Sequence, residues 1–355
     1  MIRSTSQSGF PFGNIHKHVH LFSAQFKSTM ARVQLSREFA LVMLLTTLKM
    51  QAVQLERSST GDSRPIIGIL TQTTEQRSIS KFGRSFISAS YVKLMESGGA
   101  RVVPIFVNQT EDYYRKMFNS INGIVFPGGG TKVFGTQTGI GRSAAYMFEY
   151  AKESFDKGDY FVVYGICFGF ELLAMLRDDF SCLTTNLSAS DISLPLNFTQ
   201  GYEKSRMFGK APEDIISILS TQNVTFNAHR KGVTTTTFNQ NHKLNSFYQD
   251  LSTNKDKNGQ EFISSMEAYE YPIYGTQWHP EKNPFEWNMH SEKNIPHSGD
   301  AVKVSQYMAE FIVSEARKSN HSFSSQEEEQ KALIYNYQPF YTGDIYIMEQ
   351  CYVFK

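Results

Sequence analysis

The 355-residue chain has little net charge, few cysteines and, near its N-terminal end, an apolar run too short for a membrane span. The formal net charge of +1 gives no reason to expect nucleic acid or an anionic membrane as a partner. Three cysteines, Cys167, Cys182 and Cys351, cannot build a disulfide framework, although Cys182 and Cys351 could pair in an oxidising compartment. The apolar stretch at residues 40–48 is too short to cross a bilayer comfortably.

What is present suits a globular protein with a sizeable core. Hydrophobic residues make up 40% of the chain and aromatic residues 14%, and the length allows one large α/β domain or two modest ones. Short apolar runs typical of buried strands alternate with helix-spaced apolar residues, which is the rhythm of a mostly parallel sheet with helices on both faces. The predicted strands are 66–70, 101–106, 123–126, 161–164, 234–238, 261–266 and 273–277, and the predicted helices are 87–96, 111–119, 141–157, 211–221 and one from 301. Residues 239–258 are predicted to be a loop or hairpin.

The most informative stretch is a strand that turns into a helix at a cysteine. Phe161–Tyr164 is apolar and too short for a helix, which favours a buried parallel strand. Cys167 follows, with Gly165 two residues before it and Gly169 two residues after it, and a helix-compatible run continues from Phe170. This pattern predicts a nucleophile elbow, in which small residues permit a tight turn and the helix N terminus favours a thiolate. A buried core cysteine between packing glycines is the alternative.

A glycine-rich loop follows the strand at 123–126. The run Pro127-Gly128-Gly129-Gly130 places bare backbone amides where a ligand can come close. The loop lacks the Lys-Ser/Thr pair of a phosphate-binding loop, so that reading is disfavoured. A plain flexible turn is the alternative.

A histidine and a carboxylate stand at the end of the strand at 273–277. This strand leads into Trp278-His279-Pro280-Glu281. His279 can take the proton of the Cys167 thiol and later protonate a leaving amine, while Glu281 orients the imidazole ring. If this motif stood alone, a structural histidine would be the favoured interpretation. Because the chain also carries the predicted elbow at Cys167, the sequence favours acyl transfer catalysed by a thiol.

The N-terminal part has the shape of a secretory leader. Two arginines, Arg32 and Arg37, precede the apolar residues 40–48, and the small residue Ala52 lies just beyond. We therefore expect Met30 to be the working initiator and cleavage to fall near Ala52, with an ordinary amphipathic helix as the alternative. Five Asn-x-Ser/Thr tripeptides support a secreted glycoprotein; they begin at Asn108, Asn186, Asn197, Asn223 and Asn320.

Several long motifs together resemble the γ-glutamyl hydrolases, a branch of the class I glutamine amidotransferase-like enzymes. The motifs, in chain order, are FPGGG, YGICFGFELL, QWHPEKNPFEW and EEEQKALIYNYQPFYTGDIYIMEQCYVF. The resemblance covers roughly Arg64 to the C terminus. It implies a class I glutamine amidotransferase-like fold and a lysosomal or extracellular thiol peptidase that removes γ-linked glutamates from folylpoly-γ-glutamates, antifolate forms included. It implies neither a metal nor a cofactor, and it suggests a homodimer.

The resemblance also assigns roles to residues of this chain. It implies Cys167 as nucleophile, His279 as base and Glu281 as the group that orients it. The further implied roles are oxyanion amides at Gly129 and Phe168, substrate positioning by His229, and a contact of Glu171 with the glutamyl moiety. For Glu171, the ordinary amphipathic pattern of a helix is the alternative. The run Arg230-Lys231-Gly232-Val233 departs somewhat from the family's usual sequence after the histidine at 229.

The resulting division of the chain is read from composition and motif together. We expect a solvated charge run at 326–330, and an aromatic, β-rich end at 334–354 that adds an edge strand or packs on a subunit surface. The predicted parts are a disordered extension (1–29), a signal segment (30–52), a linker (53–63), an amidotransferase-like hydrolase domain (64–323) and a tail packed on that domain (324–355).

Two other functions share parts of the pattern. A glutaminase subunit that delivers ammonia to a synthetase uses the same elbow and His-x-Glu, but a secretory leader makes little sense for it. An inactive relative that only binds folate-like ligands would not need Cys167, His279 and Glu281 together.

Overall fold

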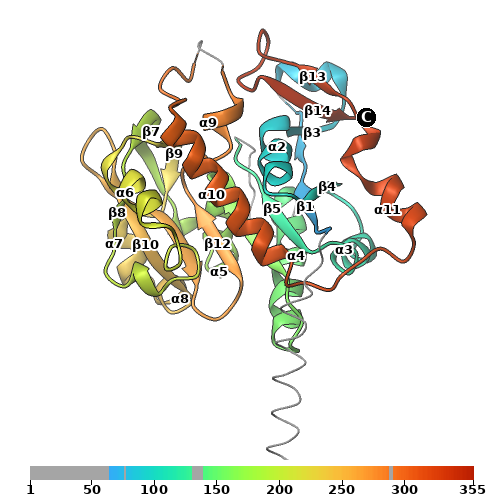
Figure 1. Cartoon of the computed structure of the whole chain (residues 1–355), viewed down its shortest axis with the longest axis horizontal. Helices are drawn as coiled ribbons and strands as arrows, with labels where there is room; N and C mark the ends of the chain where they lie inside the picture. Colours follow the sequence, from blue (N-terminus) through green and yellow to red (C-terminus); the bar gives the residue numbers. More distant parts are fainter. Residues whose placement is uncertain (1–63, 76, 130–138, 288–290) are drawn as a thin grey trace, which may run out of the picture. The chain divides into compact units, whose positions relative to one another are not determined.

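An eight-stranded sheet carries the catalytic candidates, and five of its strands run parallel. In the computed structural model, which describes residues 64–75, 77–129, 139–287 and 291–355, the strand order is β4-β1-β5-β6-β12-β11-β10-β8 (Figure 1). The pairs from β4 to β12 are parallel, whereas β11, β10 and β8 pair antiparallel. The strands are β1 Ile66–Leu70, β4 Arg101–Ile105, β5 Gly123–Phe126, β6 Val162–Ile166, β8 Asn197–Phe198, β10 Tyr248–Lys255, β11 Glu261–Ala268 and β12 Ile273–Thr276. The predicted α/β class with a mostly parallel central sheet is confirmed; the expectations for residues 1–63 lie outside the described residues.

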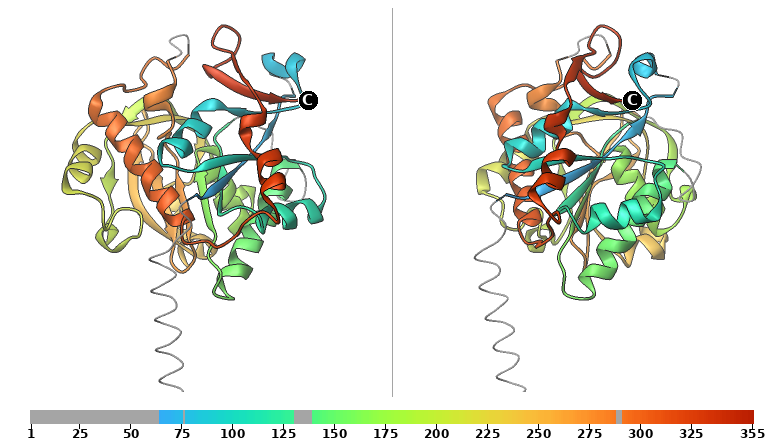
Figure 2. Two further views of the ribbon diagram at one scale, coloured as in Figure 1. Left: turned by 45° about the vertical axis from the view of Figure 1, so that its right-hand side comes forward. Right: turned by 90° about the vertical axis from the view of Figure 1, so that its right-hand side faces the viewer.

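Helices cover both faces of this sheet. They are needed because apolar side chains along each strand point alternately to one face and to the other. Ile66 and Ile124 point into one hydrophobic cluster, and their chain neighbours Ile67 and Val125 point into another. Figure 2 shows helix α10 on one side and helices α3 and α4 on the other. The first cluster is covered by α3 Glu111–Phe118, α4 Gly139–Phe155 and α5 Phe168–Arg177, and the second by α2 Ala89–Ser97, α6 Glu213–Thr221 and α10 Gly299–Ala316. Pro104 lies in the edge strand β4, one of the places where a sheet tolerates proline.

The C-terminal residues build a second, smaller sheet. Its order is β13-β14-β3-β2, so the last strand of the chain lies inside a sheet and pairs antiparallel with β3. The strands are β2 Gln72–Thr73, β3 Ser85–Ser88, β13 Pro339–Tyr341 and β14 Gln350–Phe354. A two-stranded ribbon, β7 Thr184–Leu194 with β9 Thr225–Gly232, completes the strands of the described part.

The charge run at 326–330 is more than a solvated surface. It belongs to helix α11, Gln326–Ala332, and Glu329 accepts hydrogen bonds from Arg101 and from Arg64. Glu328 pairs with Lys116 at 3.0 Å. These contacts dock the helix onto the edge strand β4 and helix α3, which composition alone did not indicate.

The strand predicted at 234–238 is wrong. Residues Thr235–Gln240 form helix α7, because the hydroxyl of Thr234 accepts the backbone N–H of Thr237 at 3.1 Å and caps the first turn. This cap outweighs the β-propensity of four consecutive threonines. The segment 239–258 contains helix α8, His242–Asn245, and the polar strand β10, so the predicted excursion includes a hairpin with β11.

The cysteines are free and buried, and the possible Cys182–Cys351 pair is not formed. Burial is the main cause that raises the pKa of each of these two thiols to about 12, so both are inert at neutral pH. Within the described ranges, no helix combines the length and apolar character needed to cross a bilayer.

Replacing Gly169 tests the packing that shapes the elbow. A Cβ at this position would lie 1.8 Å from the backbone oxygen of Phe126, so Gly169→Ala must push α5 away from β5. We expect the free energy of unfolding to fall by about 3 kcal/mol or more, measured by urea denaturation. Gly299→Ala is the matched control, because a Cβ there meets nothing within 4 Å. Equal stability of the two variants would contradict this packing.

Candidate active site

The nucleophile elbow is present in the structure. Strand β6 ends at Ile166, helix α5 begins at Phe168, and Cys167 between them has φ 52° and ψ −104°. A positive φ is unfavourable for a residue with a Cβ, typically by about 1–3 kcal/mol, and such strain is common at catalytic positions. The turn is fixed by hydrogen bonds from Cys167 N to Thr276 O at 2.8 Å and from Glu171 N to Cys167 O at 3.0 Å. The thiol thus stands at the carboxyl edge of the sheet, beside the helix N terminus.

His279 and Glu281 form a buried pair next to the cysteine. Strand β12 lies beside β6, and its continuation places His279 Nδ1 2.6 Å from Glu281 Oε1. A Cβ built on Gly128 would lie 2.7 Å from His279 Cε1 and 3.2 Å from Cys167 Cβ, so imidazole and cysteine meet at one glycine. His279 Nε2 is buried and makes no well-aligned hydrogen bond in the described part. The Cys167 side chain nevertheless lies close enough to contribute to the pKa of this imidazole.

The charge of His279 is set by its two acidic neighbours. Burial by itself lowers the pKa of this imidazole, but the negative charges of Glu281 and Cys167 outweigh burial and raise the pKa to about 10. The imidazole of His279 is therefore protonated at neutral pH. A positive charge beside a cysteine favours the thiolate, which is the nucleophilic form.

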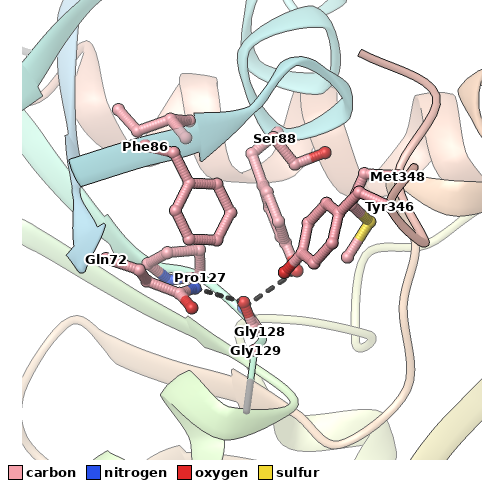
Figure 3. Close-up of a pocket in the computed structure, with 10 residues that line it drawn as sticks. Gln72, Phe86, Ser88, Pro127, Gly128, Gly129, Tyr346 and Met348 are labelled. Carbon is pink, nitrogen blue, oxygen red and sulfur yellow. Dashed lines mark hydrogen bonds between the residues drawn. The ribbon is translucent and has the colours of Figure 1, made fainter. Parts of the chain in front are cut away.

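The glycine loop has one amide occupied and one open. Gly128 N donates to the hydroxyl oxygen of Tyr91 at 2.8 Å, and Gly128 O accepts a hydrogen bond from the side-chain amide of Gln72 (Figure 3). The Gly129 N–H finds no acceptor among the described residues, and Phe168 N begins a helix and so lacks an intrahelical acceptor. These are the two predicted oxyanion amides. Gly130 lies outside the described residues.

Glu171 and Gln277 form a buried polar pair beside the nucleophile. Glu171 lies one turn into α5 and is 6% exposed. Burial raises the pKa of its carboxyl to about 7, an effect opposed by the charge of Lys231 and by Gln277 and His279. Neither atom of the fully buried Gln277 amide makes a well-aligned hydrogen bond in the described part. Two unsatisfied amide atoms indicate a place for a polar ligand.

His229 lies beside this pair but its nitrogens are already engaged. Nδ1 is 2.7 Å from Lys231 O, and Nε2 is 3.2 Å from Asn227 Oδ1. Burial is the largest effect on its pKa, which falls to about 4, so His229 is neutral where His279 is charged. A Cβ on Gly232 would lie 3.2 Å from Gln277 Oε1 and 3.7 Å from His229 Nδ1, which places His229 next to Gln277.

Four residues of the site were not predicted from the sequence: Tyr91, Gln72, Gln277 and Lys282. Lys282 is fully buried; its ammonium group pairs with Glu292 and lies 3.7 Å from Met348 Sδ. The position of Gln277 and Lys282, either side of His279 and Glu281 in QWHPEK, was a usable signal. Nothing in the sequence near Tyr91 or Gln72 distinguishes them from ordinary core residues.

The loop after His279 is tied to the C-terminal sheet. Glu286, which follows helix α9 (Lys282–Phe285), accepts hydrogen bonds from Glu349 N at 2.7 Å and from Ser88 Oγ at 3.0 Å. Together with Lys282 and Met348, this contact joins the histidine loop to the second sheet.

The five candidate glycosylation asparagines are all exposed: Asn108, Asn186, Asn197, Asn223 and Asn320. Asn197 Nδ2, the atom that would carry a glycan, donates to Thr253 Oγ1 at 3.1 Å. Modification there would remove or weaken that bond, and glycosylation at all five stays a prediction. In the described part, no group of three or more His, Cys, Asp or Glu side chains is placed to hold a metal ion.

The raised pKa of Glu171 predicts a pH-dependent contribution to stability. Between about pH 4.5 and 7 the folded protein keeps a proton that the unfolded chain has released. The free energy of unfolding therefore falls as pH rises through this window, by up to roughly 3 kcal/mol from this group.

Urea denaturation at several pH values between 4.5 and 7.5 checks this. Glu171→Gln should flatten the fall relative to the wild type, while Glu153→Gln, whose side chain is 54% exposed, should leave it unchanged. Identical slopes for the wild type and Glu171→Gln would show that the carboxyl of Glu171 is not perturbed.

Comparison with known proteins places this site in a family. The family described as Peptidase C26 matches residues 65–281, which include Cys167, His279 and Glu281. The γ-glutamyl hydrolase of Homo sapiens is 45% identical over 317 residues, 88% of this chain and 98% of the human protein. The enzyme of Rattus norvegicus is 46% identical over 83% of this chain and 91% of its own length, and γ-glutamyl hydrolase B of Dictyostelium discoideum is 41% identical over 84% and 85%. The chain belongs to the γ-glutamyl hydrolase family, peptidase C26.

Proposed function

We propose that this protein hydrolyses γ-glutamyl amide bonds, with folylpoly-γ-glutamates and their antifolate analogues as substrates, through a covalent intermediate on Cys167. The observation that carries the proposal is the convergence of Cys167 and the His279–Glu281 pair at Gly128, with two backbone amides beside them. The γ-glutamyl bond comes from the family, and the thiol chemistry comes from this geometry.

The geometry supports a two-step acyl transfer. The Cys167 thiolate attacks the γ-carbonyl carbon, and the N–H groups of Gly129 and Phe168 stabilise the negative charge that develops on the oxygen. The tetrahedral intermediate collapses, the C–N bond breaks, and His279 gives its proton to the leaving amine of glutamate or oligo-γ-glutamate. Water, deprotonated by His279, then attacks the thioester; the shortened chain leaves as an acid and the thiol is restored.

The buried polar pair suits the glutamyl residue that is held during this reaction. A γ-glutamyl residue within a chain carries an α-carboxylate and an amide N–H. Gln277 offers both a donor and an acceptor that make no well-aligned hydrogen bond in the described part. Glu171, with a pKa of about 7, is protonated in acid and can then donate a hydrogen bond. His229, which is neutral, lies next to Gln277 and helps to position it.

Lys231 is a candidate for the charged tail. Its side chain is exposed, its ammonium group lies 5.0 Å from the ring centre of Phe180, and its charge opposes the pKa rise of Glu171, so it stands near that carboxyl. It makes no ion pair within the described ranges. A poly-γ-glutamate tail carries one α-carboxylate per residue, and an unpaired lysine at the edge of the site can bind one of them.

We also propose a secretory route that ends in the lysosome or outside the cell. The support is the leader-like pattern from Met30 to Ala52 and the five exposed Asn-x-Ser/Thr sites. A homodimer is expected from the family resemblance alone and stays a prediction.

The deciding experiment is hydrolysis of a folate penta-γ-glutamate by the purified protein, with Cys167→Ala beside it. We expect the wild type to release glutamate or short γ-linked chains, and the variant, folded to the same unfolding midpoint, to release none. Ammonia from free glutamine without cleavage of the pentaglutamate would instead make the protein a glutaminase. Binding of the folate without turnover of either compound would leave an inactive relative.

Replacing Lys231 tests tail recognition. Lys231→Ala should raise KM for the pentaglutamate by roughly 3- to 10-fold with little change in kcat, because one screened charge pair at an exposed site is lost. Added salt should raise the KM of the wild type toward that of the variant, because salt screens the charge of Lys231. Arg230→Ala is the matched control, since Arg230 is also exposed but its place in the alternation of β9 puts it on the opposite face of the strand. Equal effects of both substitutions would point to net charge alone.

A further inference from the structure

A tyrosine that takes no part in the steps above is buried against the glycine loop. Tyr91 lies in helix α2, is 1% exposed, and is among the largest fully buried side chains of the described part. A tyrosine rather than a phenylalanine at such a position has a hydroxyl that needs partners.

That hydroxyl shares its surroundings with the reacting groups. Its oxygen accepts the Gly128 N–H at 2.8 Å. A Cβ on Gly128 would lie 2.6 Å from this oxygen, 2.7 Å from His279 Cε1 and 3.2 Å from Cys167 Cβ. The tyrosine oxygen, the imidazole and the cysteine therefore surround one glycine from three elements of the fold.

The hydroxyl stays protonated and has an acceptor for its own hydrogen. Burial, and then the negative charges of Glu281 and Cys167, raise the pKa of Tyr91 well above its ordinary value. Glu281 Oε1 is taken by His279, while Oε2 is buried and accepts no bond in the described part. A neutral hydroxyl can accept from Gly128 and turn its hydrogen toward that carboxylate.

A second side chain holds the other side of Gly128. Gln72, at the start of β2, donates from Nε2 to Gly128 O, and a Cβ on Gly129 would lie 2.0 Å from Gln72 Oε1 (Figure 3). In a trans peptide the carbonyl of one residue points opposite to the N–H of the next. Fixing the Gly128 carbonyl therefore fixes the direction of the Gly129 N–H, the amide left open for the substrate.

We propose that Tyr91 is a positioning residue for the oxyanion amide. By accepting the Gly128 N–H, it locks the peptide before Gly128 while Gln72 locks the peptide after it, so that the Gly129 N–H is aimed before substrate arrives. The inference rests on the proposed acyl-transfer function. These two hydrogen bonds preorganise the oxyanion donor. Without them, a loop of consecutive glycines would sample many conformations and would not hold the Gly129 N–H in place.

The test compares turnover with thiol reactivity in Tyr91→Phe. Hydrolysis of the folate pentaglutamate should lose roughly 10- to 100-fold in kcat with KM within about two-fold, since a misplaced donor acts on the transition state. Alkylation of Cys167 by iodoacetamide should stay within about two-fold of the wild type, because it uses the thiolate but develops no oxyanion. Unchanged kcat, or an equal loss of alkylation, would overturn the proposal.

Tyr248→Phe separates this role from a merely structural one. Tyr248 is also fully buried and its hydroxyl donates to a backbone oxygen, Leu173 O, at 3.1 Å. Both variants should lose similar stability in urea, and only Tyr91→Phe should lose kcat. A kcat loss of equal size in Tyr248→Phe would also overturn the proposal.

Failure of the proposed function can be told apart from failure of this inference. If the wild type does not cleave the pentaglutamate but releases ammonia from glutamine, the substrate assignment fails. The same variants are then compared on glutamine, whose hydrolysis passes through the same kind of tetrahedral oxyanion, and the same kcat pattern decides the role of Tyr91.

Discussion

The close approach of helix α5 to the end of strand β5 is the contact on which the rest of the site depends. It is possible only because residue 169 has no side chain, with the Phe126 carbonyl where a Cβ would be. This approach brings the N terminus of α5 beside the loop that follows β5, and so puts Cys167, Phe168 and the Gly128–Gly129 peptides within one small volume. The strained backbone of Cys167 is the local cost of this arrangement, and the surrounding sheet holds it.

Three buried titratable side chains show how one environment produces different charge states. Burial disfavours the charged form of all three, so His229 is kept neutral and Glu171 is protonated up to about pH 7. Of the three, only His279 keeps its charged form, because the charges of the neighbouring Glu281 and Cys167 raise its pKa by more than burial lowers it. One buried environment thus holds a charged imidazole at residue 279, a neutral imidazole at residue 229 and a carboxyl at residue 171 that is protonated in mild acid.

The parts of this molecule that follow a short-range rule could be predicted from the sequence. Fewer than ten consecutive residues are enough to predict each parallel strand, the elbow at Cys167 and the pair His279–Glu281. The threonine run at 234–238 was misread because one side-chain cap decided its conformation against the propensity of four residues. Tyr91, Gln72 and Lys282 act through partners 37, 56 and 66 positions away, and no local pattern carries that information.

The ties between the histidine loop and the second sheet have a consequence for synthesis. Glu286 is anchored by the backbone of Glu349, and Lys282 lies against Met348, only a few residues before the C terminus. All strands of the central sheet, and the elbow, precede Met348 and Glu349 in the chain, so the sheet can form during synthesis before these residues have been added. A nascent chain can therefore hold Cys167 in its elbow before the contacts that fix the loop after His279 have formed.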